Sequence, residues 1–432
     1  MGMTAMKKIQ KIALIILCTG ILGLIVPVHA DTAIITGNPA PVLLWSAPTG
    51  STESMSDNAA KVACSGDGKY VVAGYGAGIV EFRDRNGSVL WRWQSPHSYY
   101  AVWQVAASGN GEYAGISLYD PYQNNRGELD YFDRAGNLLW SRPFFGIESL
   151  SGNGNVVALA EGSTISFYNA TGHFMGTTTL DGYSWTMAIS PDGSAAAAGV
   201  TTKDYAGYLY VIAVNGMVLW SVPAGSRSQT VAFSRDGNYL AAADVEKLRY
   251  FTRGGEVLWR YNSTPEFTGV AVSSDGAFIA ASSQYYLRYF NKSGTKLWEY
   301  EVPTLPTKPG PYLSHLTMSD DGGYLSVTTD SNRTLFFNRT GDLLWQRDST
   351  HWVRSTGMSR DGKYLVVGME QDFMYFDTGI DVPVAEPGPT GVAGTVIRTP
   401  APTSTPQASV PGIWVIAGIC IGILMHTVYR KK

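Results

Sequence analysis

Side chains that commonly bind metals or act as nucleophiles are scarce in this 432-residue chain, which contains six His and three Cys residues. Four His residues lie between two terminal apolar segments, at His97, His173, His315 and His351, without the regular spacing of metal ligands. The chain contains no His-Glu-x-x-His, Gly-x-Ser-x-Gly or Cys-x-x-Cys-His motif and no phosphate-binding glycine loop. We therefore predict a protein that is not an enzyme and that binds no metal or cofactor.

Aromatic side chains beside polar donors predict recognition instead of catalysis. A Ser followed by Asp-Gly or a close variant recurs eight times, and the residues five positions before each Ser align at one level: Ala60, Trp103, Gly146, Trp185, Gln229, Thr268, Ser314 and Arg354. Aromatic rings with a few donors suit a sugar ring or an extended peptide. The residues that we predict to bind the ligand are Trp103, Trp185, Gln229, His315 and Arg354. The alternative is that both Trp residues pack beneath neighbouring loops.

The recurring Ser residues define a long internal repeat. They are Ser65, Ser108, Ser151, Ser190, Ser234, Ser273, Ser319 and Ser359, with a mean spacing of 42 residues. In the unit at residues 270–300, four short segments alternate or are apolar and are separated by Asp-Gly or Ser-Gly turns. A period of this length with four strands in each unit is typical of a β-propeller. We predict an all-β fold, an eight-bladed propeller over residues 41–379.

Each unit ends in a Gly-x-Leu-Leu-Trp phrase or a variant of it. The Trp residues are Trp91, Trp140, Trp220, Trp259, Trp298 and Trp345, and Met175 takes this position in one degenerate unit. We predict that these Trp residues fill the space between neighbouring blades. The last unit lacks such a strand, whereas an isolated Val-Leu-Leu-Trp stands at residues 42–45 before the first unit. The N-terminal strand should therefore complete the last blade and close the ring, which removes exposed sheet edges.

The repeats resemble the pyrroloquinoline-quinone-type and WD-like propeller repeats of the quinoprotein dehydrogenase-like superfamily, particularly those of archaeal cell-surface proteins. The resemblance covers roughly residues 41–379. It implies a propeller but says little about function, because propellers host unrelated activities. Quinone dehydrogenases of this kind hold their cofactor with a vicinal Cys pair, a stacking Trp and a calcium site. This chain has no adjacent Cys pair, which argues against a quinone-dependent dehydrogenase, the enzymatic alternative to a binding module.

Long connections are predicted to gather on one face of the propeller, where the eight aligned positions form the mouth of the central channel. These connections span residues 94–101, 119–127, 201–207, 302–314 and 348–354. The opposite face should carry the short Asp-Gly turns and most of the Asn-x-Ser/Thr sequons. The candidate glycosylation sites are Asn86, Asn169, Asn262, Asn291, Asn332 and Asn338. The competing interpretation is that these Asn residues serve only as turn formers.

Both ends of the chain carry membrane signals. Residues 1–30 read as a signal peptide, with an uncleaved anchor as the alternative. Residues 380–411 form a Pro/Thr/Ala-rich stalk, residues 412–429 a transmembrane helix, and residues 430–432 a basic cytoplasmic tail. This order predicts a single-pass protein of the cell membrane with an extracellular propeller. Removal of the C-terminal helix by a sortase-like enzyme is an alternative, because a Pro-Gly pair precedes it.

The charge of the chain limits its partners. Six of the 32 basic residues lie in the terminal segments, so residues 31–429 carry 26 basic and 35 acidic residues, a net charge of −9. An acidic domain argues against a nucleic-acid ligand. We therefore predict a binding, adhesion or envelope-scaffold module whose ligand is a surface protein or a glycan. An envelope assembly scaffold that recruits one partner through one face is the second alternative.

Overall fold

The structure is a computed structural model that describes residues 32–35 (backbone only), 41–50, 60–97, 99–123, 126–225, 228–262, 266–303 and 312–380. The predicted signal peptide, transmembrane helix, cytoplasmic tail and all but the first residue of the predicted stalk lie outside these ranges. Within them, no helix has the length and apolar character that a membrane span requires.

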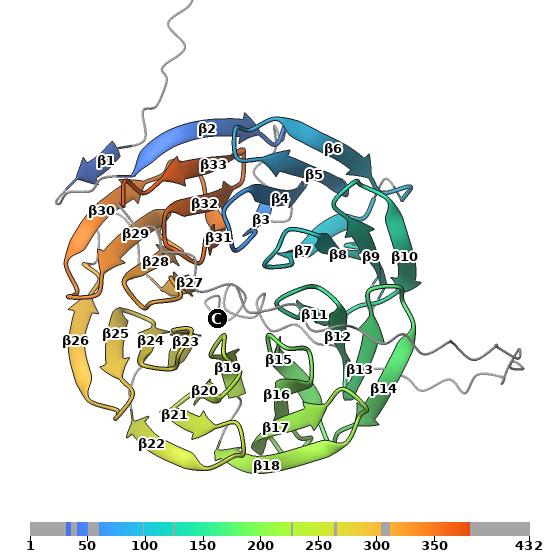
Figure 1. Cartoon of the computed structure of the whole chain (residues 1–432), viewed down its shortest axis with the longest axis vertical. Helices are drawn as coiled ribbons and strands as arrows, with labels where there is room; N and C mark the ends of the chain where they lie inside the picture. Colours follow the sequence, from blue (N-terminus) through green and yellow to red (C-terminus); the bar gives the residue numbers. More distant parts are fainter. Residues whose placement is uncertain are drawn as a thin grey trace, which may run out of the picture.

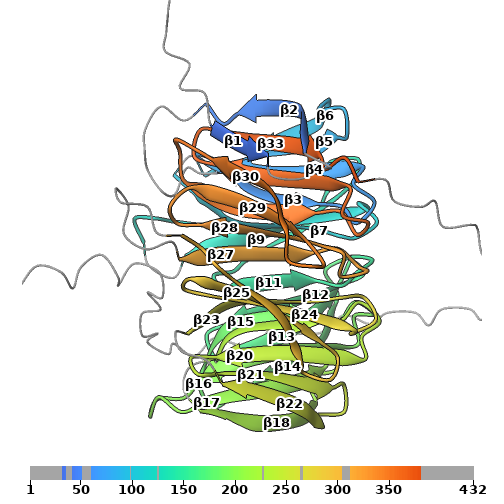
Figure 2. The same ribbon diagram turned by 90° about the vertical axis from the view of Figure 1, so that its left-hand side faces the viewer.

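Eight antiparallel sheets stand around a central channel, which confirms the predicted eight-bladed propeller (Figure 1). Seen from the side, the ring is a disc and its strands run across the thickness (Figure 2). The inner strands, in the order of blades one to eight, are β3 (Lys61–Cys64), β7 (Ala101–Ala107), β11 (Ile147–Leu150), β15 (Tyr183–Ile189), β19 (Ser228–Phe233), β23 (Phe267–Val272), β27 (Leu313–Met318) and β31 (Val353–Met358). The second strands are β4 (Tyr70–Tyr75), β8 (Tyr113–Tyr119), β12 (Val156–Glu161), β16 (Ala195–Thr201), β20 (Tyr239–Asp244), β24 (Phe278–Ser283), β28 (Tyr324–Thr329) and β32 (Tyr364–Met369).

The third and outer strands complete each blade. The third strands are β5 (Ile79–Asp84), β9 (Gly127–Asp133), β13 (Thr164–Asn169), β17 (Gly207–Ala213), β21 (Lys247–Thr252), β25 (Tyr286–Asn291), β29 (Arg333–Asn338) and β33 (Asp372–Asp377). The outer strands are β6 (Val89–Gln94), β10 (Leu138–Pro143), β14 (Phe174–Thr179), β18 (Val218–Gly225), β22 (Val257–Asn262), β26 (Lys296–Glu301), β30 (Leu343–Asp348) and, in blade eight, β2 (Val42–Pro48).

The predicted closure of the ring is confirmed, because β2 pairs antiparallel with β33 from Val42–Asp377 to Pro48–Asp372. One further strand was not predicted. Strand β1 (Thr32–Ile35) pairs antiparallel with β30 and makes blade seven a five-stranded sheet. The closing strand therefore belongs to blade eight, and the segment before it extends blade seven.

The recurring Ser residues build the turns between first and second strands. The Ser65 hydroxyl donates to the Asp67 carboxylate at 2.7 Å and accepts from the backbone N–H of Tyr70 at 3.0 Å. Gly68 supplies the positive φ of 63° that the turn needs. The Ser residue of all eight repeats is buried. The Ser-x-Asp-Gly motif therefore forms a turn whose hydrogen bonds lie within the motif and the residue that follows it, and this turn is repeated in each blade.

The predicted role of the Trp residues is confirmed. The Trp45 ring stacks on Tyr375 within its own blade at a centroid distance of 5.3 Å, and Gly87 of blade one packs on its other side. Six of the Trp residues donate their indole N–H to a backbone carbonyl of the following blade, at distances of 2.8–3.1 Å: Trp45, Trp91, Trp140, Trp220, Trp259 and Trp298. These side chains therefore join neighbouring blades both by packing and by hydrogen bonds.

The register of the outer strands corrects one prediction. Trp91 pairs with Phe82, and the residue before it, Leu90, is the extra residue of a β-bulge. In blade three the residue paired with the equivalent Phe167 is Gly176, and Met175 is the extra residue. Gly176, and not Met175, therefore stands at the Trp position. The turn of blade four fills the space of the absent indole, because a Cβ on Gly176 would collide with the backbone of Asn215.

Candidate functional site

The residues predicted for the channel mouth share one backbone feature. Six inner strands interrupt their ladder with a β-bulge, and the extra residues are Trp103, Trp185, Gln229, Thr268, Ser314 with His315, and Arg354. In blades one and three, Ala60 and Gly146 stand just before short inner strands. A bulge re-aims a side chain and ends regular pairing. The aligned positions therefore mark one end of the channel, where the inner strands leave regular pairing.

Trp103 is the most exposed aromatic side chain among the predicted site residues. It is 42% exposed, and its ring meets Tyr119 edge-on at a centroid distance of 5.5 Å and Phe145 at 6.5 Å. Trp185 lies two blades farther on in β15 and is half-buried. Gln229 lies in β19, but its side chain is outside the described part of the structure. Trp103 thus offers an open ring face, whereas Trp185 is more enclosed.

His315 and Arg354 lie on adjacent blades, seven and eight, and form the basic side of the channel mouth with Lys61 of blade one. The His315 residue is exposed and lies on the inner strand β27, and the eight blades surround the channel that these inner strands line. This loss of bulk solvent, together with the charges of Lys61 and Arg354, lowers the pKa of His315 to about 4. His315 is therefore neutral at pH 7, and the charge on this side comes from Lys61 and Arg354. The Arg354 guanidinium lies over the exposed Trp352 ring at 4.2 Å.

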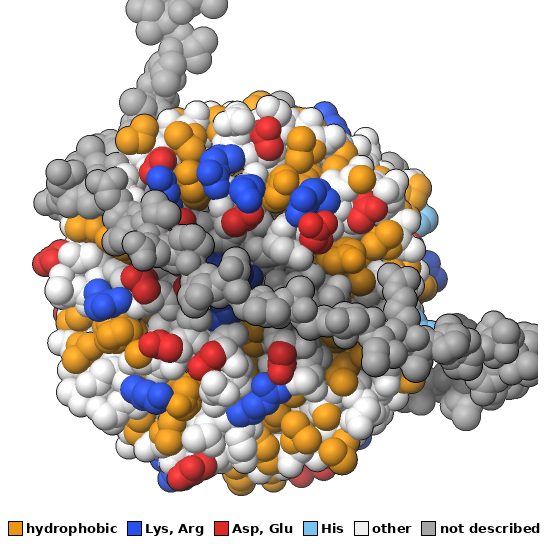
Figure 3. Space-filling view, in the orientation of Figure 1, with side chains coloured by type: hydrophobic (Ala, Val, Ile, Leu, Met, Phe, Trp, Pro, Cys, Tyr) orange, Lys and Arg blue, Asp and Glu red, His pale blue; other side chains and the backbone are white. Residues whose placement is uncertain are grey.

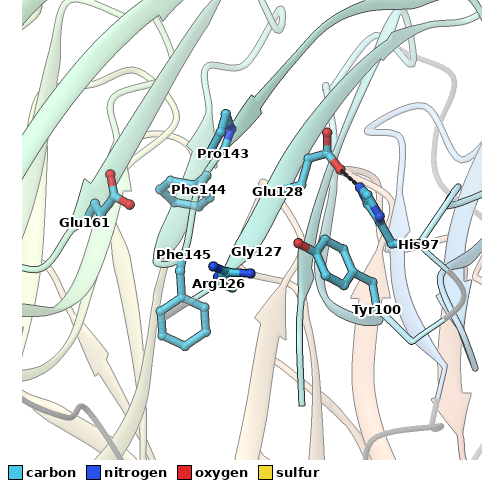
Figure 4. Close-up of a pocket in the computed structure, with 9 residues that line it drawn as sticks. All are labelled: His97, Tyr100, Arg126, Gly127, Glu128, Pro143, Phe144, Phe145 and Glu161. Carbon is cyan, nitrogen blue, oxygen red and sulfur yellow. Dashed lines mark ion pairs between the residues drawn. The ribbon is translucent and has the colours of Figure 1, made fainter. Parts of the chain in front are cut away.

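A pocket of about 340 Å³ opens on the same face between blades two and three. Its lining residues are His97, Tyr100, Arg126, Gly127, Glu128, Pro143, Phe144, Phe145 and Glu161. Glu161 lies at one end, the Glu128–His97 pair at the other, and the two Phe rings between them (Figure 4). The Trp103 ring lies beside Phe145, which lines the pocket, so the pocket borders the channel mouth at these two side chains.

Carboxylates give the pocket its polar character. Nε2 of His97 lies 3.8 Å from one Glu128 oxygen, and the other oxygen accepts a hydrogen bond from Ser141. Burial raises the pKa of Glu161, against the opposing effects of the Phe145 N–H and the Arg142 charge. Carboxylates accept hydrogen bonds from hydroxyl groups, and aromatic rings stack on apolar ring faces. This combination suits the hydroxyls and the apolar face of a sugar ring.

Two further carboxyl groups are buried inside these two blades. Glu148 of β11 accepts a hydrogen bond from the Ser117 hydroxyl of β8, and burial raises its pKa to about 7. Burial likewise raises the pKa of Asp130 in β9 to about 7. Both groups therefore titrate near neutral pH, although neither lines the pocket.

Turns of neighbouring blades hydrogen-bond to one another at the opposite end of the channel. Backbone hydrogen bonds of 2.8–2.9 Å run from Arg360 to Gly66, from Gly66 to Gly109 and from Gly109 to Gly152, each joining one blade to the next. The Arg360 side chain lies over Gly66 and Gly109, where any Cβ would collide with it. This end is therefore ringed by turns that contact one another, with the Arg360 side chain packed over two of them.

Charges of both signs are interspersed over the face drawn in Figure 3, without one large field of a single sign. Among the residues that the structure describes, no three His, Cys, Asp or Glu side chains are grouped as metal ligands. A quinone site held by vicinal cysteines does not fit either, because Cys64 is the single Cys of the described residues. Burial raises its pKa to about 12, and its thiol contacts the Tyr375 hydroxyl at 3.9 Å.

Three of the six sequon side chains act as turn formers. The side-chain oxygen of Asn291 accepts hydrogen bonds from the N–H groups of Ser293 and Thr295, and Asn169 and Asn338 do the same in their turns. In the equivalent turn of blade one, the Asp84 carboxylate is the acceptor, and the backbone N–H of Asn86 donates to it. Asn262 is exposed at the end of β22, whereas Asn332 is only 7% exposed and has a φ of 67°. Turn chemistry therefore explains the recurrence of Asn-x-Ser/Thr, and glycosylation stays a prediction.

Sequence reasoning missed most of the pocket. His97 and Tyr100 stand in one predicted long connection and Arg126 in another, but Glu128, Phe145 and Glu161 lie outside the predicted connections. The one feature of the sequence that pointed to this pocket was the length of the two connections at residues 94–101 and 119–127. Their convergence between two blades depends on tertiary packing, which no local pattern reports.

Comparison with known proteins supports the fold. Residues 205–360 match the family model described as outer membrane protein assembly factor BamB. The crystal structure of the C-terminal WD40 domain of Sif2 is similar with a TM-score of 0.63 at 13% identity, covering 78% of this chain and 98% of that one. BamB from Moraxella catarrhalis is similar with a TM-score of 0.55 at 16% identity, covering 78% of this chain and all of that one. No curated protein matches the sequence significantly.

These similarities and the eight sheets agree with the resemblance found in the sequence. The chain is an eight-bladed β-propeller, and residues 205–360 are similar to the BamB family model.

Proposed function

We propose that this chain is a membrane-anchored extracellular binding module that takes a glycan or a surface protein at the channel mouth and catalyses no reaction. The observation that carries the proposal is the open ring of Trp103 beside a carboxylate-lined pocket. Aromatic faces bind sugar rings and peptides with little loss of rotamer entropy. The terminal segments of the sequence support anchoring in the membrane with the propeller outside.

The side chains around the channel mouth support binding of a polar ligand. Lys61 and Arg354 supply positive charge beside the imidazole of His315, which is neutral at pH 7. The hydroxyl groups of Thr268 and Ser314 stand at the same level and lie 3.0 and 2.8 Å from hydroxyl groups of their own second strands. Ammonium, guanidinium and hydroxyl groups donate hydrogen bonds to a sugar or a peptide.

A binding test can show whether Trp103 acts in ligand binding or only in the stability of the fold. The full-length chain in detergent would be applied to a glycan array and to solubilised envelope proteins. Replacing Trp103 with Ala should abolish retention while the melting temperature stays close to that of the wild type, because the side chain is 42% exposed. The matched control is Tyr122→Ala, since Tyr122 lies on a loop of the same blade and is 84% exposed. Equal retention of both variants would contradict the proposal.

A scaffold function is the second candidate, favoured by the match of residues 205–360 to the BamB model. A scaffold should give one stoichiometric protein partner in native-envelope cross-linking, whereas a glycan receptor should give none. The quinone-dehydrogenase alternative predicts thermal stabilisation by quinone with calcium and reduction of an electron-accepting dye. Dye reduction would overturn the non-enzymatic proposal.

A further inference from the structure

The charged side chains of the eight inner strands, which line the channel, are mostly basic. These strands contain Lys61 in β3 and Arg354 in β31, and their one acidic residue is Glu148 in β11. Glu148 is 1% exposed and accepts a hydrogen bond from Ser117 of the neighbouring blade. Its carboxyl group is therefore enclosed between blades, and the charge that the inner strands present to the channel is positive.

Lys61 and Arg354 stand at one level on adjacent inner strands. The hydroxyl group of Ser355, the residue after Arg354, accepts a hydrogen bond from the backbone N–H of Val62 at 2.9 Å. The same hydroxyl group donates to the carbonyl oxygen of Ala60 at 3.0 Å. Because Ala60 and Val62 flank Lys61, these two bonds fix the height of β31 against β3. The two cationic residues are therefore held side by side across the junction of blades eight and one.

The neighbouring blades extend this basic pair into an arc, in which β27, β31, β3 and β7 follow one another around the channel (Figure 1). On one side stands His315, an exposed residue of β27 on which the charges of Lys61 and Arg354 both act. On the other side stands Trp103 of β7, which is 42% exposed. The Arg354 guanidinium is oriented by its contact of 4.2 Å with the Trp352 ring. The arc therefore joins two cations, a neutral imidazole and an open aromatic ring.

The sign of this arc is opposite to that of the domain. Residues 31–429 contain 26 basic and 35 acidic residues, yet the two cationic residues of the inner strands are neighbours at the channel mouth. A carboxylate accepts hydrogen bonds from an ammonium and from a guanidinium group, and such charge-assisted bonds are stronger than neutral ones. The pair Lys61 and Arg354 thus suits an anionic group.

The surroundings of the pair favour an acidic sugar over an acidic peptide. The open ring of Trp103 offers a stacking face for the apolar side of a sugar ring. Hydroxyl groups of Thr268 and Ser314 stand at the same level in blades six and seven. Beyond Trp103, the pocket presents the carboxylates of Glu128 and Glu161, which accept hydrogen bonds from sugar hydroxyl groups. Acidic peptide side chains offer no such donors.

From this arrangement we propose that the ligand of the channel mouth is an acidic saccharide, with a carboxylate bound between Lys61 and Arg354 and a neighbouring sugar ring stacked on Trp103. This inference rests on the proposed function and names the chemical class of the ligand. The planar guanidinium can donate two parallel hydrogen bonds to one carboxylate, and the ammonium adds a third. A neutral saccharide would make none of these charge-assisted bonds and would bind more weakly.

A glycan array that pairs each uronic-acid oligosaccharide with the neutral oligosaccharide of the same linkage tests the proposal. The full-length chain in detergent should retain at least one uronic-acid member about tenfold more strongly than its neutral counterpart, because hydrogen bonds to charged groups are the stronger ones. Raising the salt concentration from about 0.05 M to about 0.5 M should reduce this difference, since salt screens the charges.

The other outcomes of the array are distinct. Equal retention within every pair would overturn this inference and leave the proposed function standing. Retention of no saccharide would overturn both this inference and the glycan form of the proposed function. A poly-glutamate peptide is the second probe, and its selective retention in place of the saccharides would assign the basic pair to an acidic peptide and overturn the inference.

Variants of the basic pair complete the test. Lys61→Met and Arg354→Met should each abolish the preference for the acidic member, whereas Lys61→Arg keeps the charge and should retain most of it. Lys61 is only half-buried, so its variants should melt close to the wild type. The matched control is Arg260→Met, which removes an exposed cation from the outer strand of blade five and should leave the preference unchanged. A preference that survives both Lys61→Met and Arg354→Met would contradict binding by this pair.

Discussion

The indole Nε1–H of Trp45 donates a hydrogen bond of 2.8 Å to the carbonyl oxygen of Arg85, 40 residues later in the chain. Trp45 belongs to blade eight, through β2, and Arg85 to blade one. This bond therefore spans the junction at which the two ends of the propeller meet. The stacking of Trp45 on Tyr375 and its contact with Gly87 reinforce the same junction.

Removal of the closing strand should open the ring. Deletion of residues 31–46 removes most of β2 and all of β1, and exposes the edge of β33. Loss of one large aromatic side chain from a packed site costs about 3–5 kcal/mol, a large share of a typical domain stability of about 5–15 kcal/mol. The truncated chain should melt far below the wild type or aggregate, as differential scanning calorimetry and light scattering would show. Wild-type-like melting would show that β2 is dispensable for closure.

The degenerate blade gives a second prediction about packing. Gly176→Ala should destabilise the propeller by about 1–3 kcal/mol, because the added methyl group meets the backbone of Asn215. Met175→Ala should have a much smaller effect, since Met175 is 39% exposed. Urea unfolding of both variants measures the difference. If Met175→Ala were the more damaging change, the register assigned to β14 would be wrong.

The repeat made the fold predictable, whereas the register of individual strands needed the structure. Eight Ser-x-Asp-Gly turns and the isolated strand at residues 42–45 were sufficient for the blade number and for closure, because each motif acts locally. Met175 was misplaced by one residue because the absent Trp left the motif without its marker: Trp91 lies four residues after Gly87, and Gly176 lies four residues after Gly172. Strand β1 was missed because four residues outside the repeat carry no periodic signal.

The candidate site was predictable only in part for a related reason. Counting five residues back from each Ser, along a single strand, was enough to place Trp103 and Arg354 at one level. The pocket combines Glu128 and Glu161 from β9 and β12 with a loop at His97. Only the packing of blade two against blade three brings these segments together.

The buried carboxyl of Glu148 should make stability depend on pH. Its pKa is raised from 4.5 to about 7 in the folded protein, so between these values the folded state holds a proton that the unfolded state has lost. The contribution of Glu148 to the free energy of unfolding is therefore greatest below about pH 4.5 and is lost as the pH rises to about 7. The free energy of unfolding falls by about 3 kcal/mol over this range. Glu148→Gln should remove this part of the pH dependence in urea unfolding at pH 5 and pH 8. The same slope in both proteins would contradict the assignment.

The imidazole of His315 should titrate far below the usual range. Nuclear magnetic resonance of its ring protons should give a pKa of about 4 in the wild type. Replacing Arg354 with Met removes one neighbouring positive charge and should move this pKa upward, toward the ordinary value of 6.5. Arg260→Met, on the outer strand of blade five, serves as the control and should leave it unchanged. A pKa that does not respond to Arg354→Met would show that the two side chains are not coupled.

Site-specific photo-cross-linking in native membranes tests the central claim, that the channel mouth is the binding surface, most directly. A photoreactive amino acid would replace either Tyr99, which is 45% exposed in the connection that leads into β7 and leaves Trp103 in place, or Glu112, which is exposed in a turn between first and second strands on the opposite face. We expect a discrete cross-linked species from position 99 and none from position 112. Cross-links from position 112 alone, or from neither position while the chain is bound in its envelope, would contradict this claim.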